Sequence, residues 1–388
     1  MRGRWVLLAL LALAGACGAR STLGVPEVPP SPFVELALGR GWTCARTQRG
    51  AVSCWGESQG LHPEPFPSPN LVDLGAAVRI SGALDDVCAL IDDGTVRCWG
   101  ENTAGQLGID PAQSAPDWIV PTPQVVPNLP SGIVKLSTAS FSCVIGQDAS
   151  VVCFGYVPID ATPTFDARPV FHLPAGAESV SVSGTLYGSI CEGQCFTGIM
   201  EGYACAIDSE GTAWCWGLNE WGVCGDGSSR EFPTSPVRVK FDGRFQSIAT
   251  GGSDACGIDE GGDVYCWGYG GGVGDGSQKD WLVPTPIGLS QATALAAAFD
   301  HMCALGADGS VWCWGDNTSA QVGVAGGVEK VLAPTRVQGL GSALAIGAGD
   351  WHSCAIVSDG GVWCWGSNDH GQLGVGGVGM SATPLHAR

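Results

Sequence analysis

The sequence predicts an all-β repeat protein, and three observations support this prediction. Fourteen of the 18 cysteines form seven pairs with the spacing C-x9-C, and an aromatic residue and a glycine follow the second cysteine of every pair. The first cysteines of successive pairs are 44, 55, 62, 51, 47 and 51 residues apart, so a unit of about fifty residues recurs seven times. No segment shows the 3.6-residue periodicity of an amphipathic helix.

Each unit predicts four short strands. In the last unit, Cys354 and Cys364 flank Asp359-Gly360, a turn signal between two β-rich runs that indicates a hairpin. A small-residue apolar run precedes the hairpin in each unit, and a glycine-rich loop and a proline-marked strand follow it. Because a lone blade cannot bury both of its faces, seven such units predict a closed ring, a seven-bladed β-propeller over residues 33–388. We expect blades at about 33–75, 76–130, 131–176, 177–242, 243–291, 292–341 and 342–388.

The hairpin geometry predicts one disulfide in each blade. Around a three-residue loop such as 307–309, residues whose numbers sum to 616 face each other, and Cys303 and Cys313 meet this condition. In the chain-entropy model each bridge contributes about 2.8 kcal/mol of stability. A metal site and free buried thiols are the alternatives, but zinc sites use tighter C-x2-C pairs, so we expect neither a metal nor a cofactor. The predicted bridges are Cys44–Cys54, Cys88–Cys98, Cys143–Cys153, Cys205–Cys215, Cys256–Cys266, Cys303–Cys313 and Cys354–Cys364.

The N-terminus predicts export. Residues 1–16 combine a cationic start with a short apolar run, which is typical of a signal peptide, and residues 17–32 form a proline-rich tether. Small residues before Cys17 resemble a bacterial lipobox, although Ala14 stands where leucine is usual. Cys17 is therefore a lipidation candidate, with plain secretion as the alternative. We expect an extracytoplasmic protein, secreted or lipid-anchored at the bacterial cell envelope, that meets the membrane only through Cys17.

Blade four carries an insertion at 184–202, about twenty residues longer than the repeat requires. Insertions of this length are more often functional than accidental, so we expect partner-specific contacts here. A Cys191–Cys195 bridge could staple the insertion, which leaves Cys224 unpaired at a position where the repeat has leucine. Alternatively, one member of that pair reaches Cys224.

Residues 349–374 read G-x-x-H-x-C-A-x-x-x-D-G-x-V-x-C-W-G-x-N-x-x-G-Q-L-G, and residues 99–108 repeat the ending. This pattern resembles the repeat of the regulator of chromosome condensation family, and the paired cysteines resemble its secreted bacterial branch. The resemblance independently implies a seven-bladed β-propeller. It also implies guanine-nucleotide exchange on a Ras-like GTPase and docking on chromatin, as in the founding nuclear member. A net charge of 18 − 37 = −19 argues against nucleic acid as a partner, and a secreted chain meets no GTPase, so exchange is the least favoured function.

One repeat position offers candidate binding residues. It lies two residues before each first cysteine, so the ring should bring its members to equivalent points near one end. Aromatic rings, carboxylates and imidazoles there could hold a glycan or a peptide. Alternatively the histidines hydrogen-bond a neighbouring blade and the aromatic residues pack between blades. The seven residues are Trp42, Asp86, Phe141, Tyr203, Asp254, His301 and His352.

The catalytic motifs are weak. The G-x-S-x-G match at 56–60 and the G-x-G-x-x-G match at 374–379 lack the helix that each motif requires, so no catalytic residue is assigned. We therefore expect a non-enzymatic binding or interaction module whose partner is a protein or glycan at the cell envelope. The alternative is an extracytoplasmic glycan-directed enzyme whose acid and base are carboxylates near the channel mouth. The uniformity of the repeats favours binding.

Overall fold

A computed structural model describes residues 32–57, 66–114, 117–155, 157, 164–187, 190–191, 195–196, 199–229, 232–377 and 379–388. The predicted signal peptide, residues 17–31 of the tether and Cys17 lie outside these residues. Within them, no helix has the length and apolar character needed to cross a membrane.

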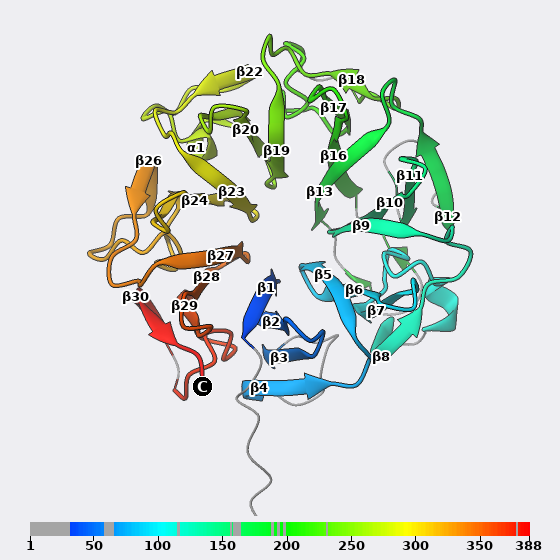
Figure 1. Cartoon of the computed structure of the whole chain (residues 1–388), viewed down its shortest axis with the longest axis horizontal. Coiled ribbons are helices and arrows are strands. Elements are labelled where there is room, and N and C mark those ends of the chain that lie inside the picture. The colour runs from blue at the N-terminus through cyan, green and yellow to red at the C-terminus, as the bar shows by residue number, and fades with distance from the viewer. Residues whose placement is uncertain are drawn as a thin grey trace, which may run out of the picture. The chain divides into compact units, whose positions relative to one another are not determined.

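The described chain folds into seven antiparallel four-stranded sheets arranged as a ring (Figure 1), which confirms the predicted propeller. Blades one to three contain β1 (Phe33–Leu38), β2 (Trp42–Thr47), β3 (Val52–Gly56) and β4 (Phe66–Val72); β5 (Ala77–Ala83), β6 (Asp86–Ile91), β7 (Val96–Glu101) and β8 (Ile119–Val125); and β9 (Ile133–Thr138), β10 (Phe141–Gly146), β11 (Val151–Gly155) and β12 (Thr164–Phe171). Blades four and five contain β13 (Ala177–Tyr187), β16 (Ile199–Asp208), β17 (Ala213–Gly217) and β18 (Val237–Arg238); and β19 (Phe245–Thr250), β20 (Asp254–Asp259), β21 (Val264–Gly268) and β22 (Trp281–Pro286). Blades six and seven contain β23 (Ala292–Ala297), β24 (His301–Gly306), β25 (Val311–Asp316) and β26 (Lys330–Arg336); and β27 (Ala343–Ala348), β28 (His352–Val357), β29 (Val362–Ser367) and β30 (Met380–His386).

The first strand of each blade lies nearest the centre and the fourth lies outermost (Figure 1). Because the strands are antiparallel, the turns between first and second strands share one end of the ring with the loops between third and fourth strands. We call this end the loop face. The hairpin turns between second and third strands lie at the other end, which we call the hairpin face. The helical segments in the described residues are the short η1 (Pro111–Gln113) and α1 (Gly270–Val273), both in loops of the loop face.

All seven predicted hairpin disulfides are present. Cys303 pairs directly with Cys313 in the register of β24 and β25, as the hairpin arithmetic requires, and the other blades repeat this register. Glycine is needed in the turn because Gly309 has φ +78°. The bridges join Cys44–Cys54, Cys88–Cys98, Cys143–Cys153, Cys205–Cys215, Cys256–Cys266, Cys303–Cys313 and Cys354–Cys364.

The core lies between neighbouring blades, and the aromatic residue after each second cysteine, tryptophan in six blades and Phe154 in blade three, is part of it. The buried Trp365 donates its indole N–H to the Gln321 carbonyl of the preceding blade's loop at 2.8 Å. Asn317 holds that loop, because its Oδ1 accepts a hydrogen bond from the Val322 amide at 3.1 Å. The glycine after the tryptophan is also structural. At Gly366 φ is +109°, and a Cβ would lie 2.5 Å from the Trp351 carbonyl oxygen.

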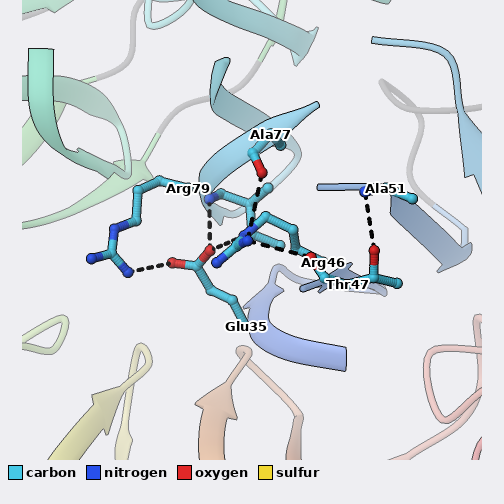
Figure 2. A network of polar contacts seen from close by, with 7 residues as sticks. Glu35, Arg46, Thr47, Ala51, Ala77 and Arg79 are labelled. Carbon is cyan, nitrogen blue, oxygen red and sulfur yellow. Dashed lines mark hydrogen bonds and ion pairs between the residues drawn. The ribbon is translucent and has the colours of Figure 1, made fainter. Parts of the chain in front are cut away.

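Side-chain contacts close the ring, since blade one is built entirely from β1–β4 and blade seven from β27–β30. Thr43 Oγ1 lies 2.7 Å from His352 Nε2 and donates to the Gln372 carbonyl at 2.9 Å. On the other side of blade one, Glu35 links it to blade two (Figure 2). Its carboxylate accepts from Arg46 Nε at 2.6 Å and lies 3.6 Å from Arg79 Nη1.

Candidate functional site

The seven residues predicted from the repeat lie between blades and not on the surface. Each lies in the second strand of its blade, at its start except for Tyr203 within β16, and is at most 2% exposed: Trp42, Asp86, Phe141, Tyr203, Asp254, His301 and His352. His301 Nε2 lies 2.7 Å from Ser353 Oγ, and His352 Nε2 lies at the same distance from Thr43 Oγ1, each on the next blade. These contacts support the structural alternative for the two histidines. Ligand binding by the seven side chains stays a prediction.

Burial sets the protonation of four of these residues. It lowers the pKa of His301 to about 4 and that of His352 to about 3, so both imidazoles are neutral at pH 7. It raises the pKa of Asp86 well above its usual range and that of Asp254 to about 8, with Asp300 adding to the latter. Asp254 Oδ2 and both carboxylate oxygens of Asp86 have no hydrogen-bond partner among the described residues.

Four residues in the turns between first and second strands, Arg40, Asp85, Asp300 and Asp350, form what we call the acidic mouth on the loop face. Arg40 of blade one lies 3.5 Å from Asp85 of blade two and 3.4 Å from Asp350 of blade seven, and Asp300 follows on blade six. Burial is the main cause that raises the pKa of Asp350 to about 6, and Asp85 and Asp300 add to it against Arg40. Burial and Asp316 likewise raise the pKa of Asp300. Burial, more than repulsion among the carboxylates, therefore keeps these two pKa values high.

A cavity of about 260 Å³ opens at this end of the channel, with Asp350 as its one carboxylate among the described lining residues. Its hydroxyl groups already join neighbouring blades. Ser81 Oγ accepts from the Thr138 amide at 3.0 Å, and Ser181 Oγ accepts from the Thr250 amide at 3.1 Å. Nowhere in the described chain do three or more His, Cys, Asp or Glu side chains form a group that could hold a metal.

Exposed aromatic residues also gather on the loop face. Among the described residues, four aromatic side chains are more than a third exposed: Trp221 at 39%, Phe232 at 47%, Tyr269 at 37% and Trp351 at 38%. Trp221 and Phe232 lie between β17 and β18, Tyr269 follows β21, and Trp351 precedes β28, so all four belong to this end. Trp221 and Tyr269 touch edge to face across blades four and five, with ring centroids 5.3 Å apart.

The blade-four insertion starts from the same end. β13 and β16 stay paired beyond the repeat, up to the partners Tyr187 and Ile199. At the tip, β14 (Ile190–Cys191) pairs with β15 (Cys195–Phe196), which places the backbone of Cys191 opposite that of Cys195. The side chains of 185–201 lie outside the description, so the Cys191–Cys195 bridge stays a prediction. Cys224 is a buried free thiol.

The sequence interpretation missed the mouth and the aromatic residues. Arg40 and Asp350 stand four residues before a first cysteine, and Asp85, Asp300 and Trp351 stand three before, so an alignment on the cysteines would have revealed them. Trp221 stands two residues after the loop asparagine, where three other blades have Ala104, Ser319 and His370. The conformation of this loop therefore does not require a tryptophan at that position.

Comparison with known proteins gives matches to two models of the regulator of chromosome condensation (RCC1) repeat, one at residues 210–256 and 308–356 and the other at 292–321 and 344–372. The ultraviolet-B receptor UVR8 of Arabidopsis thaliana is 30% identical over 196 residues, 48% of this chain and 44% of the receptor. The human E3 ubiquitin-protein ligase HERC2 is 30% identical over 195 residues, 47% of this chain and 4% of the ligase. The chain thus spans less than half the length of these curated relatives.

Solved structures share the fold. Yeast RCC1 (Prp20), crystallised bound to Kap60, superposes with a TM-score of 0.73 at 17% identity over 98% of this chain and 91% of that one. Human WBSCR16 superposes with a TM-score of 0.73 at 18% identity over 85% and 88% of the two chains. At these identities the likeness shows the propeller alone.

Proposed function

Because the chain carries repeats of the regulator of chromosome condensation family and folds as their seven-bladed propeller, we propose that it is an extracytoplasmic protein-binding module whose loop face holds the partner. RCC1-like propellers bind proteins, and the yeast relative was crystallised with Kap60. The disulfides support the location. Seven bridges need an oxidising compartment to form, which a signal peptide at 1–16 would provide. A lipid on Cys17 would keep the module at the envelope.

One observation carries the proposed site. The acidic mouth, the four exposed aromatic residues and the blade-four insertion all depart from the repeat, and all three lie on the loop face. The structural needs of the repeat do not explain them, because the other blades fold without them. Exposed aromatic residues that share a face with charged groups are typical of protein interaction surfaces.

The channel geometry favours binding over glycan hydrolysis. A glycosidase needs two carboxylates flanking the scissile bond. The described lining of the 260 Å³ cavity supplies Asp350 alone. The mouth also holds Asp85 and Asp300, but Asp85 and Asp350 share the guanidinium of Arg40. Glycan binding by the aromatic residues is the other outcome that the experiments below must distinguish.

Capture from a cell-envelope extract tests the proposal. We expect the intact chain to retain a defined protein, and the chain lacking 186–200 to lose it while unfolding at the same temperature. Asp85→Asn with Asp300→Asn should weaken capture as well. The matched control is Asp308→Asn with Asp359→Asn, two turn carboxylates on the hairpin face, which should capture normally. Capture that survives the loop-face changes and fails in the control would contradict the proposed site.

Fractionation tests the location separately. We expect the wild-type chain in the envelope or the medium, and Cys17→Ala should move an anchored protein into the soluble extracytoplasmic fraction. Recovery of the chain in the cytoplasm with reduced cysteines would contradict export.

A further inference from the structure

We infer that the patch formed by Trp221 and Tyr269 binds Lys and Arg side chains of an extended, basic protein segment. This inference rests on the proposed function, since it names the chemistry of the partner on the same face. The patch spans blades four and five, where the two rings meet edge to face at 5.3 Å and leave both side chains more than a third exposed.

The chain already places its own cations on aromatic faces in this region. Lys330 of blade six lies with Nζ 5.1 Å from the centroid of Tyr269, and Lys279 lies with Nζ 3.7 Å from the centroid of Trp281. Both distances fall within the range in which a ring face attracts an ammonium group. Lys330 therefore shows where a cation is held, and a partner's lysine or arginine would find the same chemistry on Trp221.

The surrounding charge selects a cation over an anion or an apolar segment. The described loops 218–229 and 269–280 carry four carboxylates, Glu220, Asp226, Asp275 and Asp280, against one lysine, Lys279. Asp280 lies beside the patch, because its Oδ1 accepts from the Gly270 amide at 2.9 Å. Burial and the neighbouring Asp316 raise the pKa of Asp300, and Lys330 opposes this. A basic segment crossing from the patch toward the mouth would relieve that repulsion.

The backbone that carries the patch is well anchored, which favours binding because little backbone ordering is needed. Asn219, two residues before Trp221, is fully buried, with Oδ1 accepting from the Cys224 amide at 2.9 Å and Nδ2 donating to Ser228 Oγ at 3.0 Å. Tyr269 is fixed by its amide, which donates to the Ser253 carbonyl at 2.8 Å, and by its carbonyl, which accepts from the Gly272 amide at 3.0 Å.

The test uses a twelve-residue peptide of alternating arginine and glycine. Calorimetry at low and high salt measures its equilibrium binding to the purified chain. We expect binding that weakens with salt, and a loss of about tenfold in Trp221→Leu with Tyr269→Leu, which keeps an apolar side chain at each position but removes both rings. Trp221→Phe with Tyr269→Phe should restore most of the affinity. Lys330→Met should bind several-fold more tightly, because it frees the face of Tyr269. Leu71→Ala, an exposed apolar position on β4, is the control and should bind normally.

Three results would overturn the inference. They are equal affinity for a peptide in which citrulline replaces arginine, unchanged affinity in the leucine variant, or binding of neutral cellohexaose in place of the peptide. Failure of the inference is distinguishable from failure of the proposed function. If the peptide does not bind but envelope capture still depends on 186–200, the cation chemistry is wrong and the protein-binding site stands. If the peptide binds but nothing is captured, the cation chemistry of the patch stands and the proposed protein-binding function is wrong.

Discussion

Asp254→Asn should stabilise the protein at neutral pH, by an amount that the structure sets. Asp254 is 2% exposed, and Oδ2 has no hydrogen-bond partner among the described residues. Its position matches that of His301 and His352, which meet a hydroxyl on the next blade, whereas the next blade here offers Met302. The Asp254 carboxyl therefore lacks the hydroxyl partner that His301 and His352 have at the same repeat position.

The magnitude follows from linkage. Burial raises the pKa of Asp254 from its ordinary value of 3.8 to about 8, so the folded chain keeps a proton that the unfolded chain releases. The stabilisation of the folded chain by this proton is fully present below pH 3.8. It is lost as pH rises toward 8, at about 1.4 kcal/mol per pH unit. At pH 7 the cost is on the order of 4 kcal/mol, which Asn would remove because it stays neutral at every pH.

The assay is guanidinium unfolding followed by tryptophan fluorescence at pH 5, 6, 7 and 8. We expect the difference in free energy of unfolding between Asp254→Asn and the wild-type chain to grow steadily with pH. Taking the difference cancels the titration of the other buried groups. Asp263→Asn, an exposed carboxylate on the hairpin of the same blade, is the matched control and should follow the wild-type chain. A difference that is constant from pH 5 to 8, or that favours Asp254, would show that the folded chain does not hold Asp254 protonated.

Three further changes probe the rest of the fold. Cys303→Ala with Cys313→Ala should lower the free energy of unfolding by about 3 kcal/mol while six bridges remain, as denaturation and non-reducing mass spectrometry would measure; unchanged stability would argue against the chain-entropy estimate. His352→Gln should be less stable than the wild-type chain at pH 7, but the gap should narrow by about 2 kcal/mol by pH 5. The reason is that burial lowers the pKa of His352 from 6.5 to about 3, so its contribution is full above pH 6.5 and is lost as pH falls; a gap that widens in acid would exclude this. Thr43→Val removes the hydroxyl that the Gln372 carbonyl and His352 share as a partner. It should lower the free energy of unfolding in urea by roughly 1–3 kcal/mol. Thr122→Val, at an exposed position of β8, is the control and should leave that free energy unchanged.

The repeat made the fold predictable from sequence. The spacing of Cys303 and Cys313 fixes the hairpin register, and the register then places the disulfide, because residues facing across a hairpin are set by the turn alone. The same logic holds seven times, so an error in one blade would not have changed the architecture.

The site was less predictable because a residue's position in the repeat does not reveal whether its side chain is buried. Asp86 and His301 occupy equivalent places, and only the packing of the next blade shows that both are enclosed. Arg40 and Asp350 are 310 residues apart in the chain, and they meet only because the ring closes between blades seven and one. Trp221 could have been found as an exception to its loop position, but its contact with Tyr269 depends on the spacing of two blades.

Hydroxyl-radical footprinting of the chain with its captured partner tests the central claim, that the loop face holds the partner, most directly. The loop face presents Trp221, Tyr269 and Trp351, while the half-buried Trp312 and Trp363, the second residues of the return strands of their hairpins, report on the hairpin face. We expect the partner to lower oxidation of Trp221 and Tyr269 and to leave oxidation of Trp312 and Trp363 unchanged. Protection of Trp312 and Trp363, with Trp221 and Tyr269 oxidised as in the free chain, would contradict this claim.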